Sequence, residues 1–384
     1  MTVRRQPVLG ILGGGQLARM LALAAAPLGV KTLVVDSATD ACAGQVATLV
    51  VADWTDYAAL EAFARQVDVV TFDFENVPAE TAHWLAQRVA VFPAPRALAV
   101  AQDRLAEKTL FRECGLGTPD FMAIDTRADL DRALSTIGAP AILKTRRLGY
   151  DGKGQFRLRS LADADAAWVA LGPQASAHGL ILEAFVPFER ELSVIAVRGR
   201  DGDFRTWPLT QNWHTDGVLS LSLAPAPDVG SLQERATHLA RTLAEQLDYV
   251  GVFALELFVK GGELLGNEMA PRVHNSGHWT IEGALTSQFE NHVRAVLGLP
   301  LGDTAARGLS AMFNWIGELP DAAPVLSAVD AHWHDYGKQP RLGRKVGHAT
   351  VCAANAEQMV ERLGGIAHAL GRDQQVGPAV RELG

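Results

Sequence analysis

Hydrophobic and polar positions in the first hundred residues form short apolar runs separated by amphipathic stretches. Runs that end in glycines or a carboxylate are typical of buried strands, and the stretches between them have a helical period. Such alternation predicts an open parallel sheet with helices on its faces. We therefore expect an α/β domain at 1–102. The predicted elements are strands at 7–12, 31–35, 67–72 and 91–92 and helices at 16–28 and 80–90.

A different pattern begins near Gln102, where a predicted helix precedes two short strands joined by a glycine-rich loop. The loop, 145–155, carries several basic residues, Lys153 among them. It connects strand to strand and lacks the G-x-x-x-x-G-K-[ST] order, so it is not a Walker A loop. Its backbone N–H groups and lysine are suited to closing over phosphates. We therefore predict that the loop and its two strands form a hairpin lid over a phosphate-containing ligand.

Farther along the chain, strand patterns at 250–259 and 263–266 predict a hairpin with an acidic residue on each arm. A two-residue turn at Gly261–Gly262 would place Glu256 opposite Asn267. A three- or five-residue turn, or a bulge, would place it opposite Glu268 instead. We expect an odd-length turn, because two facing carboxylates suit a magnesium ion that also binds substrate phosphates.

The hairpin leads into the most polar stretch of the chain, 267–280, which is followed by a helical pattern at 281–297. Such polar density is too costly for a core and suits a site that holds a cation and oxyanions together. Later, after a predicted helix at 323–331, a basic turn at 332–348 is held between ordered elements, as a phosphate clamp requires. Its cations are Lys338, Arg341, Arg344 and Lys345.

Isolated polar residues elsewhere leave two interpretations open. Glu191 alternates with apolar residues on a predicted strand, so a ribose ligand and a surface carboxylate are comparable readings. His214 lies in a predicted turn, where a lone histidine is more often structural. Glu75 and Asn76 end a strand at the edge where open sheets bind ligands, but Asn76 suits a helix cap equally well.

Length, composition and charge narrow the class of protein. A chain of 384 residues is expected to contain two or three domains. Its net charge of −8 argues against a nucleic-acid partner. Three scattered cysteines suit a reducing cytoplasm, and neither a signal peptide nor a membrane-spanning run is recognisable, so no membrane partner is expected.

The turn at 13–18 fits G-x-G-x-x-A, and Asp36 follows at roughly the spacing of a ribose-binding acid. Taken alone, this turn would suggest a nicotinamide-dependent oxidoreductase. Any anion can bind such a turn at a helix N-terminus, however, so the motif is not decisive. The oxidoreductase alternative also leaves the lid and the two hairpin glutamates unexplained.

Several motifs together resemble the 5-(carboxyamino)imidazole ribonucleotide synthases, an ATP-grasp family of purine biosynthesis, from about residue 7 to about residue 355. The most specific are Gly149-Tyr-Asp-Gly-Lys-Gly-Gln155 and His274-Asn-Ser-Gly-His-Trp-Thr280, supported by Asn267-Glu268 and Gly343-Arg-Lys-Val-Gly-His348. The resemblance implies a multidomain α/β and α+β chain, an ATP-grasp fold preceded by a Rossmann-like parallel-sheet domain. Its three domains would be a substrate-binding βα domain at 1–102, a central ATP-grasp lid domain at 103–187 and a C-terminal ATP-grasp domain with the metal and substrate sites at 188–384. Leu148 and Val273 stand where the family usually has glycine and proline, and we expect activity to survive both.

The implied reaction uses ATP and Mg²⁺ to convert bicarbonate to carboxyphosphate, whose carboxyl carbon passes to the amine of 5-aminoimidazole ribonucleotide. A homodimer is the usual expectation. Another ATP-grasp ligase, such as a formate-dependent transformylase or a biotin carboxylase, remains an alternative, because substrate identity rests mainly on the basic turn and the N-terminal domain. A catalytically inactive nucleotide-binding regulator is a further alternative, and the retained magnesium ligands count against it.

The resemblance also implies which residues form the site. The predicted nucleotide ligands are Arg104, Lys108, Lys144, Gly149, Tyr150, Asp151, Gly152, Lys153, Gly154, Gln155, Glu183, Ala184, Phe185, Val186, Glu191, His214, Asn267 and Glu268. Glu256 and Glu268 would bind magnesium. The predicted substrate ligands are Gln16, Glu75, Lys338, Arg344 and Lys345, and the predicted catalytic residues are Tyr150, Arg272, His274 and Asn275. Arg272 and His274 would contact bicarbonate or the acyl phosphate.

Overall fold

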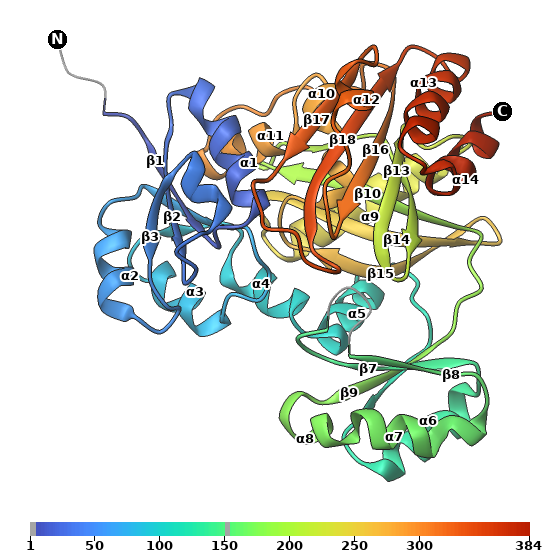
Figure 1. Ribbon diagram of the computed structural model, residues 1–384. Coiled ribbons are helices and arrows are strands. Elements are labelled where there is room, and N and C mark those ends of the chain that lie inside the picture. The colour runs from blue at the N-terminus through green and yellow to red at the C-terminus, as the bar shows by residue number, and fades with distance from the viewer. Residues whose placement is uncertain (1–4, 150–153) are drawn as a thin grey trace.

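The computed structural model describes residues 5–149 and 154–384, which form three β-sheets with helices packed around them (Figure 1). The first sheet contains β1 (Val8–Leu12), β2 (Lys31–Asp36), β3 (Thr48–Val51), β4 (Val69–Phe72) and β5 (Ala90–Val91), with helices α1 (Gln16–Ala25), α2 (Tyr57–Ala64), α3 (Ala79–Ala86) and α4 (Pro95–Ala101). Its strand order is β3-β2-β1-β4-β5, and all pairs are parallel. Every residue of β4 is buried, as expected for a strand covered on both faces. The predicted open parallel sheet is confirmed.

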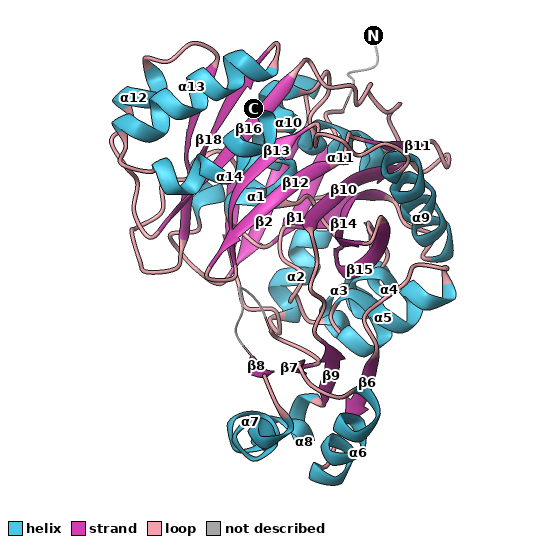
Figure 2. Cartoon of the chain, turned by 90° about the vertical axis from the view of Figure 1, so that its right-hand side faces the viewer, coloured by secondary structure: helices cyan, strands magenta, loops and turns pink. Residues whose placement is uncertain are grey.

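The second sheet is small and antiparallel, and Figure 2 shows it projecting from the rest of the molecule. It contains β6 (Phe121–Ile124), β7 (Ala141–Thr145), β8 (Gln155–Leu158) and β9 (Leu180–Ala184), with helices α6 (Arg127–Ile137), α7 (Ala164–Leu171) and α8 (Ala175–His178). The strand order is β6-β9-β7-β8. Ile124, Leu143 and Leu182 belong to a hydrophobic core of its own. The glycine-rich loop joins β7 to β8, as predicted from sequence.

The third sheet has nine strands and carries most of the remaining helices. Its strands are β10 (Arg190–Arg198), β11 (Phe204–Thr206), β12 (Thr210–Thr215), β13 (Val218–Ala224), β14 (Gly251–Lys260), β15 (Glu263–Ala270), β16 (Leu309–Ile316), β17 (Ala331–Asp335) and β18 (Lys345–Ala353). The order is β15-β14-β10-β12-β13-β16-β18-β17, and β11 pairs with β10. The helices are α5 (Arg104–Glu113), α9 (Leu232–Gln246), α10 (Thr280–Gly283), α11 (Gln288–Leu297), α12 (Ala323–Leu326), α13 (Ala356–Ala369) and α14 (Asp373–Leu383).

Alternate residues of β10 face two different cores, because side chains on a strand point to opposite faces in turn. Leu192 and Val194 pack with α9 and with Phe111 of α5. Ile195 and Val197 pack with α11 and with α1 of the first sheet, so one core joins these two parts of the chain. Helix α5, at the start of the predicted lid domain, thus packs on the third sheet. The three domain boundaries drawn from sequence stay a prediction.

Three predicted elements are wrong. The helix expected at 281–297 is broken between α10 and α11, because Ala284 leaves the helix to form a β-bridge with Ala306, and Ser287 then caps α11. The helix expected at 323–331 ends at Leu326, and the strand β17 begins five residues later. His214 lies on β12 and not in a turn.

Candidate active site

A cavity of about 380 Å³ lies where the three sheets meet. Each sheet supplies polar side chains to its wall, and most of these were predicted from sequence. The predicted residues that line it are Glu75, Arg104, Lys144, Gly149, Gln155, Glu191, His214, Glu256, Asn267, Glu268, Arg272, His274, Asn275 and Lys345. Residues far apart in the chain are therefore brought to a single site.

Glu256 and Glu268 face each other across β14 and β15, as predicted, but the expected odd-length turn is wrong. Lys260 pairs with Glu263, so the turn at Gly261–Gly262 has two residues. Leu257 pairs with Gly266, and the next residue, Glu256, pairs with Glu268. The register therefore shifts between these two pairs, and Asn267 is the extra residue of β15. A bulge puts two residues of one strand opposite one of its partner, and here it brings Glu256 opposite Glu268.

The electrostatics of this pair suit a divalent cation. Burial, followed by the charge of Glu268, raises the pKa of Glu256 to about 7. Among the described residues no group of three or more His, Cys, Asp or Glu side chains could hold a metal ion. Two carboxylates with room for phosphate oxygens match how magnesium is usually bound in nucleotide sites. The residues present therefore fit a magnesium ion that shares its ligands with a nucleotide.

Side chains of helix α5 form hydrogen bonds with the backbone of the bulge in β15. Lys108 Nζ donates to the carbonyl of the bulged Asn267 (3.1 Å), and its neighbour on the helix, Glu107, accepts from the backbone N–H of Met269 (2.7 Å). Arg104, one turn earlier, contacts Glu268 at 3.3 Å. Burial, followed by the charge of Glu268, raises the pKa of Glu107 to about 8. Sequence reasoning missed Glu107, although its spacing from Arg104 places both on one helical face.

Basic side chains from the second sheet and from α5 meet at a buried carboxylate. Glu183 lies 2.8 Å from Lys144 Nζ and 3.4 Å from Lys108 Nζ, and all three side chains are largely buried. Burial lowers the pKa of Lys144, against the opposing charge of Glu183. The backbone N–H groups of Ala184 and Phe185 bond to carbonyls of the protein. An adenine bound at 183–186 would therefore have to use other backbone groups.

The first and third sheets are joined at the cavity by an ion pair. Arg272, just after β15, bonds through Nε to the carboxylate of Glu75, which follows β4. Burial of Glu75 is outweighed by the charge and hydrogen bond of Arg272, so the pKa of this carboxyl lies below its usual value. Glu75, predicted to bind the ribonucleotide, thus lies beside Arg272, predicted to contact bicarbonate or the acyl phosphate. Val273, the departure next to Arg272, is fully buried in the core.

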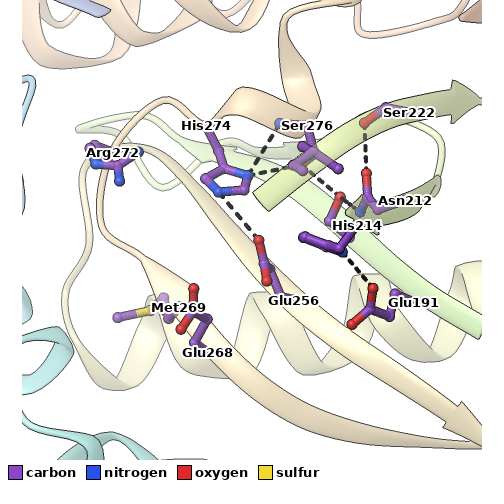
Figure 3. A network of polar contacts seen from close by, with 12 residues as sticks. Glu191, Asn212, His214, Ser222, Glu256, Glu268, Met269, Arg272, His274 and Ser276 are labelled. Atoms are coloured by element: carbon purple, nitrogen blue, oxygen red, sulfur yellow. Dashed lines mark hydrogen bonds and ion pairs between the residues drawn. The ribbon is translucent and has the colours of Figure 1, made fainter. Parts of the chain in front are cut away.

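His274 and Asn275 continue the cavity wall, and Figure 3 shows His274 between Glu256 and Ser276. His274 Nε2 lies 3.3 Å from Glu256 Oε1. Burial keeps the pKa of His274 well below its usual value. Both polar atoms of the Asn275 side chain are buried and, within the described residues, have no hydrogen-bond partner. A buried amide left without partners on a cavity wall is suited to binding a ligand.

His214 and Glu191 form a second pair on the cavity wall, with Nδ1 and Oε2 2.5 Å apart (Figure 3). They come from neighbouring strands, β12 and β10, on the same face of the sheet. Burial lowers the pKa of His214, but the hydrogen bond and charge of Glu191 outweigh it and leave the pKa raised. Of the two sequence interpretations of Glu191, a solvated surface carboxylate does not describe this position.

The remaining predicted residues lie elsewhere. Lys338 bonds to the side chain of Gln16, and neither residue lines the cavity. Arg344 donates to the carbonyl of Gln339 (3.2 Å) and does not line the cavity. Leu148 does line it and is held at φ 61°, a left-handed conformation that favours glycine. Gly154 has a positive φ and accepts from the N–H of Thr145. Tyr150, Asp151, Gly152 and Lys153 lie outside the described residues.

The glycine turn before α1 is occupied by the protein's own carboxylates. Asp36 accepts from the N–H of Gly14 (2.6 Å), and Asp73 accepts from that of Ala18 (3.1 Å). A Cβ at Gly13 would lie 2.1 Å from Asp73 Oδ1. The glycines therefore admit these carboxylates, and Asp36 is not directed at a ribose. Two of the N–H groups that could bind an anion at this turn are already bonded within the protein.

Replacing Asp73 by asparagine is expected to stabilise the ligand-free protein at alkaline pH. Burial is the main cause that raises the pKa of Asp73 to about 6. The folded protein therefore binds a proton more tightly than the unfolded chain, and stability is lost as pH rises from about 4 to about 7. Asparagine removes that loss, so Asp73→Asn should gain on the order of 1–3 kcal/mol at pH 8 and nothing at pH 4. Urea unfolding at both pH values measures this, and an equal difference at both would contradict it.

The glycine-rich connection between two antiparallel strands, the paired hairpin carboxylates and the basic side chains on the cavity wall are those of an ATP-grasp enzyme. Comparison with family models agrees with this class. Residues 109–289 match the ATP-grasp domain, 7–102 the ribonucleotide synthetase preATP-grasp domain, and 310–362 the phosphoribosylaminoimidazole carboxylase C-terminal domain.

Relatives that match nearly the whole chain identify the family more specifically than the domain models do. An N5-carboxyaminoimidazole ribonucleotide synthase of Pseudomonas aeruginosa is 51% identical over 355 residues, which cover 92% of this chain and 97% of the relative. The crystal structure of a synthetase of the same name from Thermus thermophilus has 54% identity and a TM-score of 0.90, over 94% of this chain and 98% of that one. A structure from Aspergillus clavatus, in complex with ADP and 5-aminoimidazole ribonucleotide, has 31% identity and a TM-score of 0.86, over 96% and 99%.

The chain belongs to the N5-carboxyaminoimidazole ribonucleotide synthase family. It is an ATP-dependent ligase of purine biosynthesis that carboxylates 5-aminoimidazole ribonucleotide. The resemblance drawn from the sequence motifs is confirmed. In the part of the chain that the structure describes, no helix is both long and apolar enough to cross a membrane.

Proposed function

We propose that the cavity binds MgATP, bicarbonate and 5-aminoimidazole ribonucleotide together and catalyses both steps of the carboxylation. The observation that carries this assignment is the pairing of Glu256 with Glu268 across the bulge, in the same cavity as Lys144 and Arg272. Carboxylates for a cation and cations for phosphates are what phosphoryl transfer needs, because it depends on positioning and on neutralising charge.

In this proposal Glu256 and Glu268 would hold the magnesium ion that accompanies ATP. That ion would supply positive charge to neutralise the phosphates during transfer. Lys144 and Arg104 face the same space and add positive charge. Glu191 and His214, paired on neighbouring strands, are placed to hold the ribose end of the nucleotide.

In the first step an oxygen of bicarbonate attacks the γ-phosphorus of ATP, the bond to the β-phosphate oxygen breaks, and ADP and carboxyphosphate form. Arg272 and His274 are proposed to hold bicarbonate and then the acyl phosphate, since both line the cavity near Glu256. A short-lived acyl phosphate must be kept from water. The loop between β7 and β8 is proposed to provide that cover.

In the second step the lone pair of the ribonucleotide's exocyclic amine forms the new N–C bond. The C–O bond to phosphate breaks, either directly or through CO₂, and the nitrogen loses one proton, which the released inorganic phosphate can accept. Glu75 and Lys345 line the cavity from the first sheet and from β18, where the ribonucleotide would lie. The unpartnered amide of Asn275 is proposed to bind the carboxyl group as it is transferred.

The proposed reaction is tested by ADP release measured with each substrate omitted in turn. We expect release to need 5-aminoimidazole ribonucleotide, bicarbonate and Mg²⁺ together, with the carboxylated product detected by incorporation of labelled bicarbonate. Release that proceeds equally well with formate, or with biotin as acceptor, would assign the site to another ATP-grasp ligase.

Lys345→Ala is expected to weaken binding of the ribonucleotide much more than binding of ATP. Lys345 lines the cavity, and a charge-assisted contact is worth about 1.5–3 kcal/mol, or roughly one to two powers of ten in Kd. Arg344→Ala, also predicted from sequence, should have a smaller effect because Arg344 lies outside the cavity wall. Calorimetric titration measures both, with exposed Arg341→Ala as control. An equal loss of ATP affinity in Lys345→Ala would assign this lysine to the nucleotide.

The oxidoreductase alternative makes a different prediction for ligand-induced stability. MgATP at one hundred times its Kd should stabilise the protein by about 2.7 kcal/mol, whereas NAD or NADP should change nothing. Asp36 and Asp73 already occupy the glycine turn. Melting temperatures measure this, and a shift with NAD alone would contradict the proposal. The homodimer and the cytoplasmic location stay predictions.

A further inference from the structure

A row of hydrogen-bonded side chains leads away from His274 across one face of the third sheet (Figure 3). His274 Nδ1 lies 2.9 Å from Ser276 Oγ, and Ser276 Oγ lies 2.7 Å from Ser193 Oγ. Asn212 Nδ2 lies 3.0 Å from Ser193 Oγ, and Ser222 Oγ lies 2.7 Å from Asn212 Oδ1. We call Ser222, Asn212, Ser193 and Ser276 the serine–asparagine relay.

The relay is buried and is built into the strand register. Ser193, Ser222 and Ser276 have no exposed surface, and Asn212 is 6% exposed. Ser222 and Asn212 are directly opposite each other on β13 and β12, and Ser193 on β10 is directly opposite Glu256 on β14. Four hydrogen-bonding side chains in a buried position cost free energy unless each is bonded. Apolar residues would fill this space at less cost, so the relay calls for a functional explanation.

The groups around the His274 ring indicate which way the hydrogen bonds of the relay run. The backbone N–H of Ser276 points at His274 Nδ1 (3.3 Å), and a backbone N–H can only donate. That contact favours Nδ1 as an acceptor, and the shorter contact with the Ser276 hydroxyl (2.9 Å) decides between the two tautomers, because a hydroxyl can donate or accept. The other ring nitrogen, Nε2, faces Glu256 Oε1 and must carry the hydrogen. The Ser276 hydroxyl then donates to Nδ1, and each earlier member donates to the next in turn.

We propose that the serine–asparagine relay holds His274 in the Nε2–H tautomer, so that this ring presents a hydrogen-bond donor on the cavity wall beside Glu256. The four relay residues are positioning residues, because none of them lines the cavity. A ring nitrogen that carries hydrogen cannot accept a proton, so His274 orients bicarbonate or the acyl phosphate and is not the base for the ribonucleotide's amine. This inference rests on the proposed function of the site.

The test is an isosteric substitution, Asn212→Asp, that reverses the direction of the hydrogen bonds along the relay. In Asn212→Asp both oxygens of the introduced carboxylate accept, so the Ser193 hydroxyl donates to that carboxylate and the Ser276 hydroxyl donates to Ser193. Nδ1 then loses its hydroxyl donor and keeps only the longer contact with the backbone N–H (3.3 Å). The Nδ1–H tautomer, which donates across the shorter contact to Ser276 Oγ (2.9 Å in the unmodified protein), is therefore favoured. Ring ¹⁵N spectra of the metal-free, nucleotide-free protein distinguish the two tautomers, and a His274→Gln spectrum identifies the signals of His274.

We expect Nε2–H in the unmodified protein and Nδ1–H in Asn212→Asp, with kcat lowered roughly 10- to 100-fold and KM for ATP little changed. The matched control is Asn291→Asp, which also places a carboxylate at a fully buried asparagine, one whose side chain bonds to the backbone of Gly302 in the loop after α11. It should keep its turnover. Nδ1–H in the unmodified protein, or an unchanged tautomer in Asn212→Asp, would overturn the proposal.

Ser276→Ala gives a second test if Asn212→Asp does not fold. It removes the hydroxyl that donates to Nδ1 and should lower kcat, while Ser276→Thr, which keeps a hydroxyl, should recover most of it. Full turnover in Ser276→Ala would contradict the relay. The ring spectra involve neither metal nor substrate, so failure of the relay is distinguishable from failure of the proposed reaction, which ADP release tests separately.

Discussion

Glu268→Gln is expected to abolish ADP release, with turnover lowered at least roughly 10³-fold, or about 4 kcal/mol of transition-state stabilisation. The substitution keeps the shape of the side chain and removes one of the two negative charges that face the proposed cation. Because the side chain of Glu268 is 43% exposed, the fold should be unaffected. Steady-state ADP release at saturating Mg²⁺ measures the loss.

The matched control for Glu268→Gln lies on the same strand. Glu263 is an exposed carboxylate of β15 that pairs with Arg235 and does not line the cavity. Glu263→Gln should therefore keep full turnover, whereas Glu256→Gln should lose as much as Glu268→Gln. Near-normal release by either cavity variant would show that the pair does not hold the metal.

Arg272→Ala is expected to lower turnover by about 10²- to 10³-fold, the range found when one group that stabilises transition-state charge is removed. Arg272 lines the cavity and bonds to Glu75, so its loss also leaves a partly buried carboxylate without its partner. Such a change is destabilising. Kinetics and urea unfolding must therefore be measured together.

The two effects of Arg272→Ala are separated by adding Glu75→Gln. The double variant no longer carries the unpaired, partly buried carboxylate, so it should recover stability relative to Arg272→Ala. Turnover should stay low, because the guanidinium is still missing. If turnover recovered together with stability, Arg272 would serve to join the two sheets and would have no part in the chemistry.

The sequence allowed the parallel sheet, the lid hairpin and the pairing of Glu256 with Glu268 to be predicted, because each depends on local pattern. The bulge at Asn267, which brings the two glutamates opposite each other, could not be predicted in the same way. Odd-length turns and bulges give the same register, and the choice made here depends on α5, where Lys108 and Glu107 hold the bulged backbone. That contact joins residues about 160 positions apart in the chain.

The serine–asparagine relay could be predicted from the sequence even less than the bulge. Ser193, Asn212, Ser222 and Ser276 are common residue types with no distinctive spacing, and their partners are set by the order of β13, β12 and β10 in the sheet. Likewise, Asp73 could be placed at a strand end from sequence, but its bond to Ala18 depends on how β4 lies beside α1. Short-range pattern predicts elements, whereas buried polar contacts depend on tertiary arrangement.

The most direct test of the proposed site is to locate its metal. Crystals grown with Mn²⁺ and a non-hydrolysable ATP analogue should give one or more anomalous difference peaks between the carboxylates of Glu256 and Glu268 and the phosphates of the nucleotide. Manganese prefers the same oxygen ligands as magnesium. Peaks at that position would support the account, and a nucleotide bound with its metal away from both glutamates would contradict it.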